Sequence, residues 1–148
     1  MYAPWRRRLL EREISGAWLD LGAGDGWALD LLEGGTGVDV EPSRPEIMPL
    51  ENGTIPLRHA SLDAIWCSHV LQFVPEPLAL LQDARRVLRP GGKIVVTVPH
   101  ARPRIPDPLD RQVRFFTGRS LKRLLTAAGF DVRVHRRLGT LVAVGTRA

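Results

Sequence analysis

Two kinds of segment alternate along the chain. In one kind, apolar residues form a short continuous run; in the other, which is longer, they recur every three or four residues. Short runs bounded by turn residues are typical of buried strands, and we expect strands over residues 17–21, 36–40, 64–68 and 93–98. The wider spacing predicts amphipathic helices over residues 4–14, 27–32, 75–88 and 120–128. Strands and helices therefore alternate, as they do in α/β proteins with a parallel sheet.

The last part of the chain has a different pattern. Phe130, Val132 and Val134 alternate with polar residues, and the apolar run 141–144 follows a turn at 138–140. Such a pair predicts an antiparallel hairpin. The expected architecture is a doubly wound α/β sandwich with a mostly parallel sheet and this C-terminal hairpin. We expect one domain over residues 1–148, with its N-terminal helix within residues 1–15.

Composition narrows the class of protein only a little. An apolar content of 44% and a charged content of 25% are ordinary for a globular domain. No apolar run approaches the roughly 20 residues that span a bilayer, and no signal peptide is recognisable, so we expect a cytoplasmic protein with no membrane span. The single cysteine, Cys67, excludes an internal disulfide and a cysteine-built metal site, and no metal is expected.

Charge is spread unevenly. Residues 101–148 hold 11 of the 21 Lys and Arg residues but only 3 of the 16 Asp and Glu residues. Such an excess can attract nucleic acid or an anionic small molecule. Nucleic acid is not the expected partner, because 19 of the basic residues are arginine, as a GC-rich coding bias produces, and aromatic residues do not interleave with them.

A glycine-rich turn follows the first expected strand, within the segment WLDLGAGDGWALDLL of residues 18–32. Its glycines, Gly22, Gly24 and Gly26, have the spacing G-x-G-x-G. The dinucleotide fingerprint G-x-G-x-x-G would need glycine at position 27, where this chain has Trp27. The turn is therefore not a typical pyrophosphate loop. By itself, it is compatible with a tight strand–helix connection of no further function.

Carboxylates around this turn indicate what it binds. Asp20 and Asp25 bracket the glycines, where they would oppose a pyrophosphate but suit an ammonium or a sulfonium. Asp39 ends the second expected strand, where a carboxylate can accept both hydroxyls of a ribose. Together these positions point to an adenosine whose 5′ end carries positive charge.

Several motifs resemble those of the class I S-adenosylmethionine-dependent methyltransferases, which have a Rossmann-like fold. The first motif of this family resembles the segment LDLGAGDG of this chain, and the second motif resembles GVDVEP. The branch that methylates quinones, lipids and other small molecules resembles this chain in the long stretch IPLRHASLDAIWCSHVLQFVPEPLALLQDARRVLRPGGKIVVTVP and in the closing helix FFTGRSLKRLLTAAGF. The resemblance covers residues 16–135 and implies S-adenosylmethionine as cofactor and S-adenosylhomocysteine as product.

The resemblance also implies roles for individual residues. Asp20 would bind the methionine ammonium, the three glycines would let the backbone approach the donor, and Asp39 would hold the ribose hydroxyls. The residues that end the fourth strand would line the methionine end through backbone groups; they are Cys67, Ser68 and His69.

The adenine side departs from the family pattern. The segment between Gly26 and Asp39 is several residues shorter than usual, and the next helix and strand are compressed into SRPEIMPLENG. Glu51 falls where an acidic residue contacts the adenine amino group, with Asn52 as the other candidate. A degenerate member that binds the cofactor without turnover therefore stays an alternative.

Methyl transfer needs alignment of the reactants more than it needs a strong acid or base, although a base helps when the nucleophile must lose a proton. His100 is the better candidate base and His69 the weaker one, because His100 opens the loop where this family usually meets its acceptor. Cys67 is expected to be a small buried side chain rather than a nucleophile.

The loop over residues 99–117 is the expected acceptor side. Its arginines can hold a carboxylate or a phosphate, or they can simply face solvent on a proline-stiffened connection. Phe115 and Phe116 are expected in the core, one on each face. The N-terminal helix with Trp5 can close the cleft or pack against the sheet edge.

Three functions remain in view. The first is a methyltransferase acting on a small molecule, with an anionic acceptor among the options. The second is a cofactor-binding module that acts with a partner chain or as a homo-oligomer. The third, an RNA or protein methyltransferase, is disfavoured because many such enzymes carry N/D-P-P-Y/F after the fourth strand, where this chain has CSHV.

Overall fold

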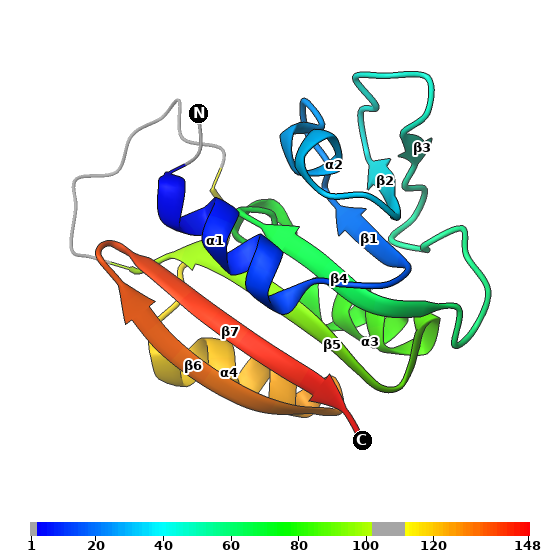
Figure 1. Cartoon of the computed structure of the whole chain (residues 1–148). Coiled ribbons are helices and arrows are strands. Elements are labelled where there is room, and N and C mark those ends of the chain that lie inside the picture. The colour runs from blue at the N-terminus through cyan, green and yellow to red at the C-terminus, as the bar shows by residue number, and fades with distance from the viewer. Residues whose placement is uncertain (1–2, 102–111) are drawn as a thin grey trace.

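A seven-stranded sheet in the order β3-β2-β1-β4-β5-β7-β6 forms the centre of the protein (Figure 1). The computed structural model describes residues 3–101 and 112–148. The first five strands run parallel; they are β1 (Trp18–Leu21), β2 (Gly35–Asp39), β3 (Met48–Pro49), β4 (Leu62–Ser68) and β5 (Leu88–Pro99). The antiparallel hairpin consists of β6 (Phe130–Arg137) and β7 (Thr140–Arg147), and β7 pairs with β5. The predicted fold class is confirmed.

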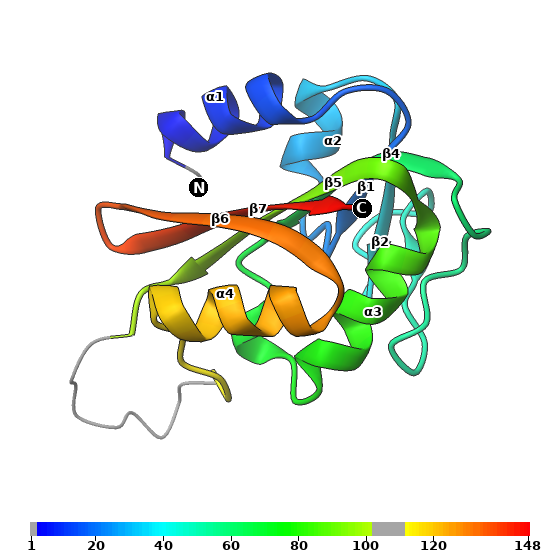
Figure 2. The ribbon, with the colours of Figure 1, turned by 90° about the horizontal axis from the view of Figure 1, so that it is seen from below.

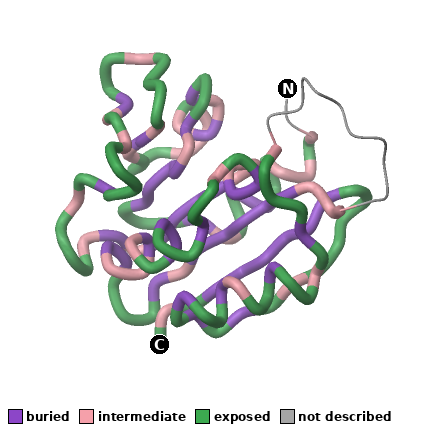
Figure 3. Tube along the Cα trace, turned by 180° about the vertical axis from the view of Figure 1, so that it is seen from behind, coloured by how far each residue is buried: buried purple, intermediate pink, exposed green. Residues whose placement is uncertain are grey.

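Helices cover both faces of the sheet, as Figure 2 shows. One face carries α1 (Pro4–Glu13) and α2 (Trp27–Leu31), and the other carries α3 (Pro77–Val87) and α4 (Gly118–Ala127). A short 3-10 turn, η1 (Leu71–Phe73), follows β4. Buried positions run along the central strands (Figure 3). None of the described helices combines the length and the apolar character needed to cross a membrane.

Each face of the sheet has its own apolar core. On the α1 side, Leu9, Leu10 and Trp18 pack with Trp66 and with the inner residues of β7. The opposite core includes the buried leucines of α3 and α4. The N-terminal helix therefore packs over the face of the sheet rather than against its edge.

Two expectations about local structure need correction. Phe116 is buried, but Phe115 is 54% exposed, so the prediction that both lie in the core is wrong for Phe115. Neighbouring residues of an extended segment point to opposite sides, and only the side of Phe116 faces the core. The strand expected at 93–98 begins earlier, at Leu88, which pairs with Leu62 before an irregularity shifts the register.

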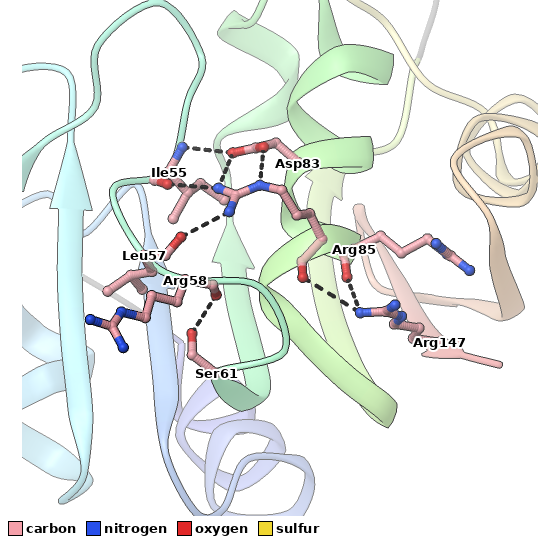
Figure 4. A network of polar contacts seen from close by, with 8 residues as sticks. Ile55, Leu57, Arg58, Ser61, Asp83, Arg85 and Arg147 are labelled. Atoms are coloured by element: carbon pink, nitrogen blue, oxygen red, sulfur yellow. Dashed lines mark hydrogen bonds and ion pairs between the residues drawn. The ribbon is translucent and has the colours of Figure 1, made fainter.

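The connection between β2 and β4 contains no helix in the described structure, and β3 is only two residues long. Side chains of α3 hold this connection in place (Figure 4). Arg86 donates to the carbonyl oxygens of Ile55 and Leu57 at 2.8 and 2.9 Å and to Asp83 at 2.7 Å. Asp83 in turn accepts a hydrogen bond from the Ile55 amide at 2.7 Å. This half-buried network takes the place of regular secondary structure.

We expect Arg86→Met to lower the free energy of unfolding by about 2–3 kcal/mol, because two carbonyl groups and a carboxylate lose charge-assisted hydrogen bonds. Urea denaturation measures this change. The matched control is Arg58→Met, at an exposed arginine of the same connection, which should cost less than about 0.5 kcal/mol. Equal losses in the two variants would show that the Arg86 contacts do not hold the connection.

Candidate functional site

A cavity of about 450 Å³ opens beside the carboxyl ends of β1 and β2. Its wall includes Gly22 and Asp39 from these strand ends, Asn52 from the following connection, and residues of η1 and the start of α3. The carboxyl edge of a doubly wound sheet is where such folds bind ligands. The volume lies within the usual range for small-molecule sites, roughly 300–1,000 Å³.

The glycine turn shapes one wall of the cavity. Gly22 and Gly26 have φ angles of 81° and 84°, in the left-handed region that side chains rarely adopt. A Cβ atom at Gly22 would lie 2.3 Å from Cγ2 of Val70, so a side chain does not fit there. The side chain of Val70 therefore fills the space beside Gly22, and both residues line the cavity. The close approach of a donor to the turn stays a prediction.

Asp39 is fixed by two backbone hydrogen bonds. One carboxylate oxygen accepts from the Gly24 amide at 2.9 Å, and the other accepts from the Glu41 amide at 3.0 Å. Each carboxylate oxygen has further acceptor capacity, and the residue lines the cavity. Asp39 is thus oriented by the glycine turn and can still accept hydroxyl donors.

Asp20 is almost completely buried, with 4% of its surface exposed. Burial, together with the nearby charges of Asp39 and Asp25, raises the pKa of its carboxyl group to about 7. Among the ion pairs of residues 3–101 and 112–148, none involves Asp20 or Asp39. A cation placed beside these carboxylates would restore the ionised form of Asp20.

The residues that end β4 have distinct surroundings. Cys67 is fully buried in the core on the α3 side, and burial raises the pKa of its thiol well above the ordinary value. It is a core residue, as the sequence suggests. The Ser68 hydroxyl shares a hydrogen bond of 2.8 Å with that of Thr97, and the His69 amide donates to the Thr97 carbonyl at 2.8 Å.

The His69 ring meets a residue that sequence reasoning missed. Its Nε2 atom contacts Nη2 of Arg6, which reaches over from α1. Burial and the charge of Arg6 lower the pKa of His69 to about 4, so the ring is neutral at pH 7 and accepts from the guanidinium. The sequence could not single out Arg6, because the same short helix contains several arginines with similar neighbours.

Of the predicted site residues, Gly22 and Asp39 line the main cavity. Those that do not line it are Asp20, Gly24, Gly26, Glu51, Cys67, Ser68, His69 and His100. Glu51 and Asn52 are both exposed and both line a neighbouring hollow, but only Asn52 also lines the main cavity. His100 lies just after β5, where its amide donates to the Gly139 carbonyl of the hairpin turn at 3.0 Å. It is not among the residues that line the cavity. Much of the expected acceptor loop, with Arg102, Arg104 and Arg111, lies outside the described residues.

The inserted last strand, the glycine turn after β1 and the acidic residue ending β2 together define the Rossmann-like methyltransferase class. Residues 2–135 match the family described as "Methyltransferase domain", and the chain belongs to this family. The resemblance to S-adenosylmethionine-dependent methyltransferases is thereby confirmed, and the same matches support the expected cofactor.

The proteins that this chain resembles are methyltransferases named for different substrates. The chain is 33% identical over 113 residues to demethylmenaquinone methyltransferase of Tropheryma whipplei, covering 64% of this chain and 47% of that protein. The chain spans about half or less of the length of the curated relatives it matches. Ubiquinone biosynthesis O-methyltransferase of Xanthomonas axonopodis is similar over a shorter stretch, with 32% identity over 69 residues, covering 47% of this chain and 26% of that protein.

Two solved structures share the fold. A SAM-dependent methyltransferase from Aquifex aeolicus has a TM-score of 0.76 and 20% identity, covering 95% of this chain and 88% of that one. The second is a 1,6-didemethyltoxoflavin-N1-methyltransferase from Burkholderia thailandensis with bound 1,6-didemethyltoxoflavin and S-adenosylhomocysteine. Its TM-score is 0.75 at 22% identity, covering 98% and 77% of the two chains.

Asp20 should make the ligand-free protein less stable as the pH rises from about 4 to 7. In this window the folded protein holds a proton on Asp20 that the unfolded chain, with a pKa near 3.9, has released. Stability measured by urea denaturation should therefore rise in Asp20→Asn relative to wild type by up to about 1.4 kcal/mol per pH unit. The exposed Asp131→Asn serves as control. Parallel pH profiles of wild type and Asp20→Asn would contradict the raised pKa.

Proposed function

We propose that the protein transfers a methyl group from S-adenosylmethionine to a small-molecule acceptor and releases S-adenosylhomocysteine. The observation that supports this most directly is the combination, at one strand edge, of a glycine turn, a fixed Asp39 and a buried Asp20. Family membership supports the same chemistry.

The described residues fit this cofactor. Gly22 and Asp39 both line the cavity, and Asp39 presents acceptors of the kind that two ribose hydroxyls need. Asp20 is a buried carboxylate with no ion-pair partner in the described structure, so a methionine ammonium would neutralise it. Asn52 lines the cavity and is therefore better placed than Glu51 to meet the adenine.

When bound, S-adenosylmethionine supplies a methyl group on a sulfonium whose leaving group departs neutral. The task of the chain is to align the reactants and exclude water. The apolar part of the cavity wall, with Val70, Phe73 and Leu80, serves the second purpose.

A base is needed only for acceptors whose nucleophile must lose a proton. His100 is our candidate for this role, because it lies at the carboxyl end of β5 beside the hairpin turn. His69 is a poor candidate, since a group with a pKa of about 4 that already accepts from Arg6 is a weak base at neutral pH. The demethylmenaquinone methyltransferase among the relatives favours an acceptor of the quinone or phenol type.

Calorimetry tests the cofactor assignment. S-adenosylmethionine and S-adenosylhomocysteine should bind, and NAD should not. Asp39→Ala should weaken binding of both nucleosides by about tenfold or more, because hydroxyl donors lose a charged acceptor. Asp131→Ala, on an exposed face of β6, is the control and should bind normally. Unchanged binding in Asp39→Ala would refute the ribose assignment.

Turnover separates an enzyme from a binding module. Incubation with S-adenosylmethionine and a panel of quinones, phenols and carboxylates should release S-adenosylhomocysteine with at least one class. With a hydroxyl acceptor, His100→Gln should reduce kcat by about 100-fold or more. The alternative, a module that acts with a partner chain, requires normal cofactor binding with no turnover of any member of the panel. Full activity of His100→Gln would remove the base assignment alone.

A further inference from the structure

A small basic pocket lies between α1 and the C-terminal hairpin. Its volume is about 230 Å³, and none of its lining residues lines the main cavity. The wall combines basic side chains of two elements with one aromatic ring; they are Arg8 and Arg12 of α1, His135 and Arg137 of β6, and Trp5 of α1. The proposed methyl transfer gives this concentration of positive charge no role.

The spacing of residues along α1 forms one wall of this basic pocket. Trp5, Arg8 and Arg12 are three and four positions apart, so they share one stripe of the helix. Leu9 in the same stripe lies in one buried core with Val142 of β7. This apolar contact holds the two arginines beside the hairpin.

The alternation of side chains along β6 supplies the other wall. Val132 and Val134 pack in the core on the α3 side of the sheet. Because successive side chains of a strand point to opposite faces, His135 and Arg137 point to the α1 side. Both belong to the basic last third of the chain, and the structure places them opposite the arginines of α1.

Positive charge in the basic pocket is only partly balanced. Arg12 contacts Glu13 at 3.3 Å. No carboxylate of residues 3–101 and 112–148 pairs with Arg8 or Arg137. The Arg137 guanidinium lies 5.8 Å from the centre of the Trp5 ring, a cation–π contact that orients it without neutralising it. The pocket therefore favours an anion.

A phosphate monoester matches this pocket better than a carboxylate does. It carries a charge of about −1.5 to −2 at pH 7 and three acceptor oxygens on one centre, whereas a carboxylate has one charge and two oxygens. Guanidinium groups from both walls can therefore bond different oxygens of one phosphate. The volume lies below the roughly 300–1,000 Å³ of drug-sized sites, which suits a phosphate on a short attachment rather than a whole nucleotide.

We propose that the basic pocket is a second binding site of this protein, for a phosphate monoester. Two sources present the same chemistry, a soluble ester such as glycerol 3-phosphate and the headgroup of phosphatidic acid on a lipid surface. The proposal does not depend on the methyltransferase assignment, because the two cavities share no lining residue.

Calorimetry with glycerol 3-phosphate tests the soluble source. Wild type should bind with a Kd of about 1 mM or tighter, and Arg8→Met or Arg137→Met should weaken binding about tenfold, because each removes charge-assisted hydrogen bonds. Arg137→Lys keeps the charge without the planar fork and should lose less. The matched control, Arg123→Met, removes the same charge from an exposed position of α4 on the other face of the sheet and should bind normally.

Cosedimentation with vesicles tests the lipid source. Phosphatidylcholine vesicles that contain phosphatidic acid should then bind the protein about tenfold more tightly than vesicles with an equal charge of phosphatidylglycerol, whose phosphate is a diester. Arg8→Met and Arg137→Met should remove this preference, and Arg123→Met should keep it.

The proposal is overturned if wild type neither binds glycerol 3-phosphate nor prefers phosphatidic acid. Binding of succinate, a dianion without phosphate, as tightly as glycerol 3-phosphate would overturn it as well. An equal loss in Arg123→Met would show a general effect of net charge instead of a site. Arg8 and Arg137 are exposed, so thermal unfolding should find their variants folded, with Tm within about 2 °C of wild type.

Discussion

Burial of a carboxylate at the carboxyl edge of a parallel sheet is the constraint on which the proposed site depends. Asp20 lies on β1 between β2 and β4 and is 4% exposed, while Asp39 and Asp25 add negative charge nearby. Such a group favours folding only when it is protonated or meets a cation. At neutral pH the buried Asp20 therefore lowers the free energy of unfolding, and a positively charged ligand bound beside it would raise that free energy again.

The other half of the site depends on contacts between distant segments. The connection from β3 to β4 lacks regular structure, and Arg86 and Asp83 of α3 fix it through its backbone groups. At the opposite side, α1 brings Arg6 to His69 from 63 positions earlier in the chain. Both arrangements use an arginine, whose long side chain ends in a guanidinium with several N–H donors.

The sequence predicted well those features that local chemistry determines. The glycine turn and Asp39 lie where their spacing indicated, because only a few backbone conformations connect a strand to a helix across that turn. Features that depend on tertiary packing were harder to foresee. Arg6 has two neighbouring arginines with similar local sequence, Phe115 and Phe116 differ only in which side of an extended segment they occupy, and Asn52 rather than Glu51 reaches the cavity.

The order of strands in the sheet has a consequence for biosynthesis. Of the described strands, β7 is made last, yet it lies between β5 and β6, and seven of its residues are registered with β5 from Lys93 to Pro99. While a ribosome still holds residues 140–147, β5 has an unpaired edge and β6 has no neighbour. These strands must therefore be kept from pairing with other chains until residues 140–147 have left the ribosome and paired with them.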